Sequence, residues 1–271
     1  MSVPELPEME NYKIILNQRV AGQVITGITV TREKSINVNV DLFRKSVLNQ
    51  KVVTVNRRGK HILFQLDNNS VLLLHLMLGG WMFYGTDAEK PKRTIQVQLS
   101  FGEENLYFIG LRLGYLHLYS PAEVENRLAH LGPEPLAAEF TKEEFLKTLA
   151  LKHGRLKTTL LDQEFIAGIG NCYSAEICFD ACIKPVRDID ELHEKERIRL
   201  FNSMKSILEK GVRYGGYMEH PFFNGDIVTG GFQDQCLIYD REGQTCKRCG
   251  TIIVMEMVSS RKTFYCPNCQ R

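Results

Sequence analysis

The sequence has no apolar run long enough to cross a lipid bilayer as a helix. Its longest apolar stretch, residues 71–83, contains His75 and two glycines, whereas a spanning helix needs about 20 apolar residues. The first residues carry Glu5 and Glu8, where a secretory signal needs basic residues followed by an apolar segment. We therefore expect a cytosolic protein that is neither secreted nor bound to a membrane.

The sequence also has no excess of either charge, no internal repeat and no low-complexity segment. Lysine and arginine number 34 against 32 aspartates and glutamates, so the formal net charge is +2. With 44% hydrophobic and 24% charged residues, the composition is that of an ordinary globular protein and argues against a disordered chain. A length of 271 residues predicts two domains with room for a small appendage.

Cysteine, by contrast, is plentiful, and four of the eight cysteines lie in the last 26 residues. The pattern there is Cys246-Lys-Arg-Cys249, then 16 residues, then Cys266-Pro-Asn-Cys269. Because the cytosol keeps thiols reduced, two close thiolate pairs predict a tetrahedral Zn²⁺ site, with two disulfides or a redox pair as alternatives. The segments 252–254 and 263–265 have the pattern of short strands, which predicts a hairpin that needs the metal to fold.

Hydrophobic periodicity divides the chain into a β-rich part and a helical part. After a helix at 7–18, short strands are expected at 24–30, 61–66, 71–76, 95–101 and 106–118, a pattern typical of an antiparallel sandwich or barrel. Two prolines in the segment 131–135 mark a linker. Beyond it we expect helices at 141–149, 155–164, 173–181 and 189–214, and then a mobile loop at 217–235. The sequence therefore predicts an α+β protein with several domains.

Three places in the sequence are candidates for binding an anion. The segment 57–60, Arg-Arg-Gly-Lys, puts three basic residues at a turn, although a solvated face is the plainer interpretation. The glycine-rich segment 167–171 joins two expected helices, and we expect Asn171 to cap the second helix, where free N–H groups bind phosphate. Lys157 is placed to add a second phosphate contact, and a simple tight turn is the alternative. Arg261, at the tip of the expected hairpin, either grips phosphate or faces solvent.

Six motifs together resemble the formamidopyrimidine-DNA glycosylase/endonuclease VIII family. They are PELPE at 4–8, RRGK at 57–60, HLML at 75–78, LGPEPL at 131–136, LLDQEFIAGIGNCYSAE at 160–176 and RKTFYCPNCQ at 261–270. The resemblance covers almost the whole chain. It implies an N-terminal antiparallel β-sandwich at 1–130, a helix–two-turns–helix domain at 131–235 and a C-terminal zinc-finger β-hairpin at 236–271.

The resemblance also implies an activity and a partner. The expected protein is a base-excision repair enzyme, a DNA N-glycosylase with AP lyase activity. We expect a monomer on duplex DNA that contains a damaged or abasic nucleotide, with one structural zinc ion, in a bacterial-type cytosol or nucleoid. Pro4 matches the family's N-terminal proline, whose amine attacks the sugar C1′ and forms a Schiff base. Glu5 matches the acid/base glutamate, and Lys60 matches the lysine that contacts phosphate beside the lesion. The other DNA-binding residues expected from the motifs are Arg58, Lys157, Asn171 and Arg261.

One departure from the family pattern concerns the nucleophile. Pro4 is preceded by Met1, Ser2 and Val3, so its nitrogen is a tertiary amide whose lone pair is delocalised into the carbonyl group. The amine of Ser2 or of Lys60 is then an alternative nucleophile, and removal of the extra residues is another route to an active protein. The rival interpretation is a catalytically altered or inactive relative that binds damaged or abasic DNA without Schiff-base chemistry.

A second departure concerns the gap that a flipped base leaves in the duplex. The family fills this gap with a Met, an Arg and a Phe, and this sequence has Leu78 (or neighbouring Met77), Leu111 and Leu113 at the matching places. Apolar side chains can wedge a kinked base step open. A leucine cannot form hydrogen bonds with the orphaned base, so we expect weak selectivity for the opposite base.

Overall fold

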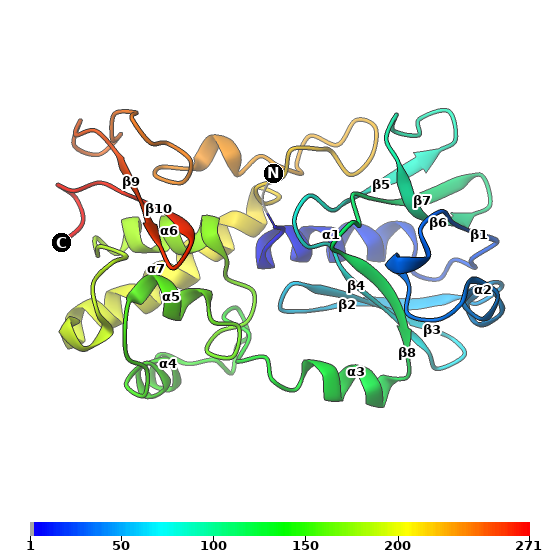
Figure 1. The fold of residues 1–271 in the computed structure, drawn as a ribbon, viewed down its shortest axis with the longest axis horizontal. Coiled ribbons are helices and arrows are strands. Elements are labelled where there is room, and N and C mark those ends of the chain that lie inside the picture. Colours follow the sequence, from blue (N-terminus) through cyan, green and yellow to red (C-terminus); the bar gives the residue numbers. More distant parts are fainter. Residues whose placement is uncertain (1–2) are drawn as a thin grey trace. The chain divides into compact units, whose positions relative to one another are not determined.

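The computed structural model describes residues 3–271, which form two compact units (Figure 1). The first unit comprises Met1–Ala129 and Tyr214–Gly231, and the second comprises His130–Arg213 and Phe232–Arg271. The first break lies beside the predicted boundary at 130. The grouping differs from the predicted division after that point, because the loop at 214–231 joins the β-rich unit and the C-terminal hairpin joins the helices.

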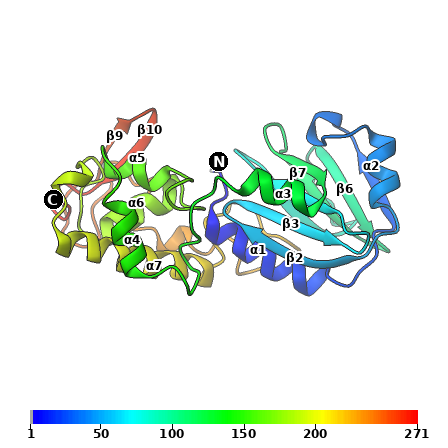
Figure 2. The ribbon, with the colours of Figure 1, turned by 90° about the horizontal axis from the view of Figure 1, so that it is seen from below.

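The first unit is an antiparallel β-sandwich, as predicted. One sheet has the order β1 (Gly27–Val30), β6 (Ile95–Phe101), β7 (Glu104–Ile109) and β5 (Trp81–Thr86), and the other has the order β2 (Val52–Arg58), β3 (His61–Leu66), β4 (Val71–His75) and β8 (Tyr115–Tyr119). Neighbouring strands pair antiparallel in both sheets. Helix α1 (Leu6–Arg19) packs along β2 (Figure 2).

The inner faces of the two sheets meet in one apolar core. Alternate residues of β3 are buried, and the ring of Phe64 lies 6.3 Å from that of Phe108 on the opposite sheet. Helix α1 adds the fully buried side chains of Met9, Tyr12 and Leu16, which fall on one face because they are three and four residues apart. The core therefore fixes the position of α1 and of the segment that precedes it.

Two predictions for this unit need correction, and two helices were missed. Strand β1 begins at Gly27 rather than at residue 24. The strand predicted at 106–118 is two strands, because Gly110 has a positive φ of 73° and a Cβ there would lie 2.1 Å from the carbonyl oxygen of Gly79. Helices α2 (Val40–Val47) and α3 (Pro121–Leu128) were not predicted. Each has only 8 residues and is capped by a side chain, that of Asn39 or Ser120.

The second unit is helical and ends in a β-hairpin. Its elements are α4 (Lys142–Leu149), α5 (Leu156–Leu161), α6 (Asn171–Asp180), the 3₁₀ turn η2 (Ile189–Glu191), α7 (Glu194–Arg213), the 3₁₀ turn η3 (Gln233–Gln235), β9 (Val254–Val258) and β10 (Arg261–Tyr265). The predicted cap of α4 is confirmed, since the Thr141 side chain accepts a hydrogen bond from Glu144 N. The helix predicted at 189–214 begins instead at Glu194, after η2.

A buried carboxylate fastens the start of the C-terminal segment to α6. Glu176 is 1% exposed and accepts hydrogen bonds from the backbone N–H groups of Leu237, Ile238 and Tyr239, at 2.8 to 3.1 Å. Phe179 of α6 and Phe264 of β10 belong to the same apolar core cluster. The hairpin is thereby packed on the helical unit.

We predict that Glu176→Ala destabilises the second unit by about 3 kcal/mol, because buried N–H groups lose their acceptor and such groups cost about 1–3 kcal/mol each. Urea unfolding followed by circular dichroism measures the change. Glu164→Ala, which removes an exposed glutamate from the same unit, is the control. Equal stability of the two variants would contradict the assigned role of the Glu176 carboxylate.

Within residues 3–271, no helix combines the length and the apolar character that crossing a membrane requires.

Candidate functional site

The first unit contains a cavity of about 540 Å³. Its walls come from Pro4, the turn and strand start at 78–81, the end of β7 with the turn that follows, and the loop residues 217–220. Cavities of about 300–1,000 Å³ are typical of small-molecule sites. The predicted residues Pro4, Leu78 and Leu113 all line this cavity, so the fold brings together positions that are more than 100 residues apart in the sequence.

A single carboxylate holds the N-terminal segment against one of these walls. Glu8 is 2% exposed, and its Oε2 accepts a hydrogen bond from Glu5 N at 2.6 Å. Its Oε1 accepts a hydrogen bond from Tyr217 N, also at 2.6 Å. Gly216 must be glycine here, because its φ is +77° and a Cβ would lie 2.5 Å from Glu8 Oε1. Glu8 therefore fixes the predicted catalytic residues Pro4 and Glu5 relative to the loop.

The role of Glu8 was missed from the sequence, where it has the ordinary place of an acidic residue in the first turn of a helix. Its partner Tyr217 is 209 residues away, and no local pattern marks such a contact. Glu5 is also buried, with 3% of its surface exposed. Because Val3 precedes Pro4, the Pro4 nitrogen is an amide nitrogen in this chain. The Ser2 amine, proposed as an alternative nucleophile, lies outside the described residues.

The basic segment 57–60 forms the turn between β2 and β3, with Gly59 at a positive φ of 54°. Arg57 Nε lies 2.7 Å from Glu10 Oε2, so this residue pairs with α1. Arg58 lines a second cavity of about 410 Å³ beside α3. Burial of the imidazole lowers the pKa of His75 to about 3, and the neighbouring His61 and then the ammonium group of Lys60 add to this lowering. The DNA contacts of Arg58 and Lys60 stay predictions.

The predicted wedge residues do not share one environment. Leu78 and Leu113 are 51% and 63% exposed at the cavity, as expected of side chains that contact a partner. Leu111 is 0% exposed in the core of the sandwich, and its backbone N–H donates to Gln96 Oε1 at 3.1 Å. The expectation that Leu111 is presented as a wedge is therefore corrected. Its neighbour Arg112 lines the cavity instead.

In the second unit, Lys157 and Asn171 lie together at the start of α6. The N-cap residue is Gly170, so Asn171 is the first residue of the helix and the expected cap is corrected. Lys157 is 0% exposed, and its Nζ donates to the Asn171 carbonyl oxygen at 3.1 Å and to Ser174 Oγ at 2.8 Å. A buried ammonium group behind the helix N-terminus adds to the positive potential there. The phosphate contacts of both residues stay predictions.

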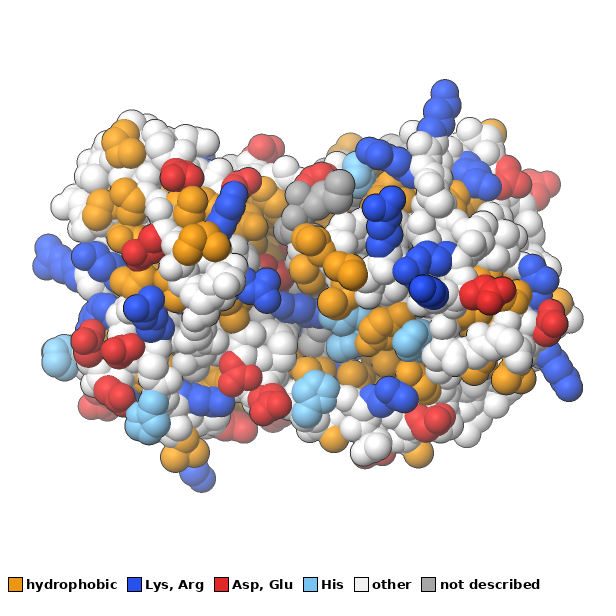
Figure 3. Space-filling view, in the orientation of Figure 1, with side chains coloured by type: hydrophobic (Ala, Val, Ile, Leu, Met, Phe, Trp, Pro, Cys, Tyr) orange, Lys and Arg blue, Asp and Glu red, His pale blue; other side chains and the backbone are white. Residues whose placement is uncertain are grey.

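Arg261 lies at the hairpin tip, as predicted, and is exposed. Ser259 and Ser260 have φ values of 47° and 61°, and two positive φ values in a two-residue connection define a type I′ turn. On the face shown in Figure 3, lysines and arginines are interspersed with acidic side chains. The charges on this face therefore do not mark a binding surface, and the proposed DNA contacts rest on the named basic residues.

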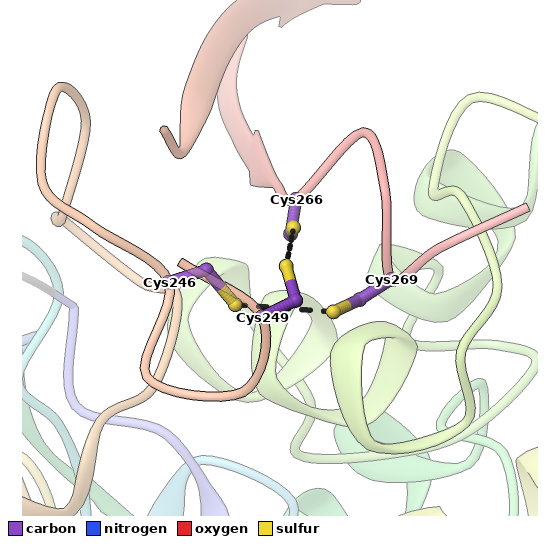
Figure 4. Close-up of side chains that lie close together, drawn as sticks. All are labelled: Cys246, Cys249, Cys266 and Cys269. Carbon is purple, nitrogen blue, oxygen red and sulfur yellow. Dashed lines mark hydrogen bonds between the residues drawn. The ribbon is translucent and has the colours of Figure 1, made fainter. Parts of the chain in front are cut away.

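The four C-terminal cysteines converge on one centre (Figure 4). Their sulfur atoms lie within 4.8 Å of one another. The Sγ atoms of Cys246 and Cys269 are 3.9 Å apart, and those of Cys249 and Cys266 are 3.5 Å apart. A tetrahedral site with Zn–S bonds of about 2.3 Å needs S···S separations of about 3.8 Å. The donor set therefore fits one structural zinc ion, held by these four thiolates.

Comparison with known proteins agrees with this geometry. Family models match residues 3–115 (formamidopyrimidine-DNA glycosylase N-terminal domain), 131–220 (formamidopyrimidine-DNA glycosylase H2TH domain) and 243–271 (zinc finger found in FPG and IleRS). A formamidopyrimidine-DNA glycosylase of Pelotomaculum thermopropionicum is 34% identical over 275 residues, which cover 99% of both chains. That of Cytobacillus firmus is 35% identical over 274 residues, which cover 99% of this chain and 100% of the relative.

Solved structures of Fpg from Lactococcus lactis are similar throughout. A complex with DNA that contains an abasic site has a TM-score of 0.91 and 28% identity, covering 98% of this chain and 99% of the other. A complex with DNA that contains N7-benzyl-Fapy-dG also has a TM-score of 0.91 and 28% identity, covering 99% and 100%. By class the protein is a DNA glycosylase. The chain belongs to the formamidopyrimidine-DNA glycosylase family.

We predict that the purified protein contains one zinc ion per chain and that Cys249→Ala loses it, because three thiolates leave a tetrahedral position open. Metal release into a colorimetric chelator gives the stoichiometry. Cys182→Ser, which alters a partly buried cysteine outside the cluster, should keep the metal. An unchanged zinc content in Cys249→Ala would contradict the assigned ligand set.

Proposed function

We propose that this protein removes damaged bases from duplex DNA by flipping the nucleotide out of the base stack, and then cuts the abasic site by elimination. The observation that carries the proposal is the cavity of about 540 Å³ with Pro4 in its wall and Glu5 beside it in sequence. Exposed Leu78 and Leu113 at this cavity are suited to occupy the space that a flipped nucleotide vacates.

The proposed chemistry uses the nitrogen of Pro4, in the cavity wall, and the carboxyl group of Glu5, the next residue. A free amine attacks C1′ of the sugar, the glycosidic bond breaks, and the base leaves with a proton. We infer that Glu5, at the start of α1, donates a proton to the sugar-ring oxygen as the ring opens to the iminium ion. Loss of a C2′ proton then expels the 3′-phosphate. The Pro4 nitrogen can perform the attack only when no residue precedes it.

DNA contacts are proposed for basic and polar groups of both units. The β2–β3 turn offers Arg58 and Lys60, while the second unit offers Asn171, which Lys157 supports, and the exposed Arg261. We infer that the protein acts as a monomer on damaged or abasic duplex DNA, with zinc in a structural role. The curated relatives named above are bacterial, which supports a place of action in a bacterial-type cytosol, at the nucleoid.

One observation favours a second function. In the sequence as it stands, Val3 acylates the Pro4 nitrogen, which removes the nucleophile on which the imine depends. A chain in this state would bind damaged or abasic DNA, or remove a base with water as the nucleophile, without Schiff-base chemistry.

Borohydride trapping on a duplex with an abasic site separates these functions. We predict that a chain beginning at Pro4 forms a covalent adduct, whereas the chain with residues 1–3 in place forms roughly a hundredfold less, because an amide nitrogen is not an amine nucleophile. Peptide mass spectrometry locates the adduct. An adduct on Ser2 or Lys60 would overturn the assignment of Pro4. Tight binding without an adduct from either chain would support the second function.

We also predict weak discrimination between opposite bases. Rates of base release opposite cytosine, adenine, guanine and thymine should differ by less than about tenfold, because leucine offers no hydrogen bond whose loss would penalise a wrong base. Leu78→Ala combined with Leu113→Ala should lower kcat/KM for all four duplexes together. Leu151→Ala, which truncates a leucine 75% exposed in the second unit, is the control. A strong preference for one opposite base would contradict the prediction.

A further inference from the structure

Two aromatic rings stack in the wall of the cavity. The indole of Trp81, at the start of β5, and the imidazole of His220, in the loop, have centroids 4.2 Å apart and planes inclined by 33°. Both residues line the cavity. Trp81 is also packed against the apolar cluster that includes Phe83 and Ile109. The ring pair is therefore supported by the sandwich and borders the cavity that we propose takes the substrate.

We propose that the Trp81–His220 pair is the surface on which the flipped base stacks, so that Trp81 is a specificity-determining residue for base removal. This inference rests on the proposed function. A base has a flat π-face, and stacking on an aromatic side chain stabilises it whatever its hydrogen-bonding edge. Gly79, Gly80 and Gly110 also line the cavity and present no side chain to it, which leaves room for a planar group.

The loop that carries His220 is anchored on the sandwich at residues close to His220 in the sequence. Phe222 is 0% exposed, and its ring lies 5.3 Å from that of Tyr12. Its carbonyl oxygen accepts a hydrogen bond from Tyr84 N at 2.7 Å, and the guanidinium group of Arg19 lies 3.8 Å from the Phe223 ring centroid. His220 is thus held within two or three residues of these anchors. The stacking surface is formed before the base arrives, which lowers the cost of ordering it on binding.

Substrates differ in the flat surface that they offer to the ring pair for stacking. A flat oxidised base such as 8-oxoguanine presents a full face for stacking, whereas the ring of dihydrouracil is saturated and puckered and makes poorer contact. An abasic site has no base to stack. Loss of the Trp81 ring should therefore lower the reaction rate most for the flat base, less for the saturated base and least for the abasic site.

The kinetic test uses the chain form that shows activity, with the three duplexes named above. Trp81→Ala should lower kcat/KM for 8-oxoguanine release roughly ten- to a hundredfold, the range expected for one lost base–aromatic stack. The dihydrouracil rate should fall less, and abasic-site cutting should change by less than about threefold. Trp81→Phe should recover most of the loss, because phenylalanine keeps an aromatic face. Ile227→Ala, on the same loop at a side chain 93% exposed, is the control.

A spectroscopic test is available because Trp81 is the only tryptophan of the chain. Binding of an 8-oxoguanine duplex to a catalytically slow Glu5→Gln variant should quench the fluorescence of Trp81 more strongly than binding of a duplex with a tetrahydrofuran abasic analogue. Equal quenching by both duplexes would overturn the proposal. So would equal loss of all three activities in Trp81→Ala, which is the result expected if the indole only supports the fold.

Failure of the proposed function would give other results than failure of the stacking proposal alone. If the wild-type protein releases no base from any lesion duplex but still binds the abasic analogue, the proposed function fails and the stacking proposal fails with it. If the wild-type protein releases 8-oxoguanine and Trp81→Ala does so at the same rate, the stacking proposal fails alone.

Discussion

The Glu8 carboxylate is the contact on which the arrangement of the cavity depends. Its two oxygens accept hydrogen bonds from Glu5 N, at the start of α1, and from Tyr217 N, in the loop. Both bonds are short, and the carboxylate is almost completely buried. A buried carboxyl group without donors would be costly, so these two hydrogen bonds stabilise the wall. The chain start and a loop more than 200 residues later are thereby held as one wall.

The second unit uses buried polar side chains in a similar way. Lys157 donates to the first turn of α6, and Glu176 on the same helix accepts from the segment that leads to the zinc hairpin. One helix therefore connects the proposed phosphate-binding turn to the thiolate cluster. Both side chains are 0–1% exposed, so their part in the proposed DNA contacts is to position backbone, and of the residues proposed for these contacts in this unit Arg261 is the exposed one.

Local sequence patterns predicted those parts of the molecule whose structure is decided by residues near one another in the sequence. The alternation at 95–101, the cap at Thr141 and the paired cysteines are each decided within a few residues, and all three were predicted. The contact from Glu8 to Tyr217, the burial of Leu111 and the stacking of Trp81 on His220 are decided by which sheets and loops pack together. No periodicity or motif encodes such tertiary contacts, so the sequence could indicate candidate residues for the site but not their surroundings.

The type I′ turn at Ser259 and Ser260 has a consequence for how Arg261 can meet a partner. Serine pays a steric cost at positive φ that glycine avoids, and a two-residue reversal leaves almost no alternative backbone geometry. Arg261 therefore begins a strand whose main chain is already ordered. When its guanidinium group binds an anion, the entropy lost is confined to the rotamers of one side chain. A longer tip of flexible residues would lose conformational freedom along its whole length.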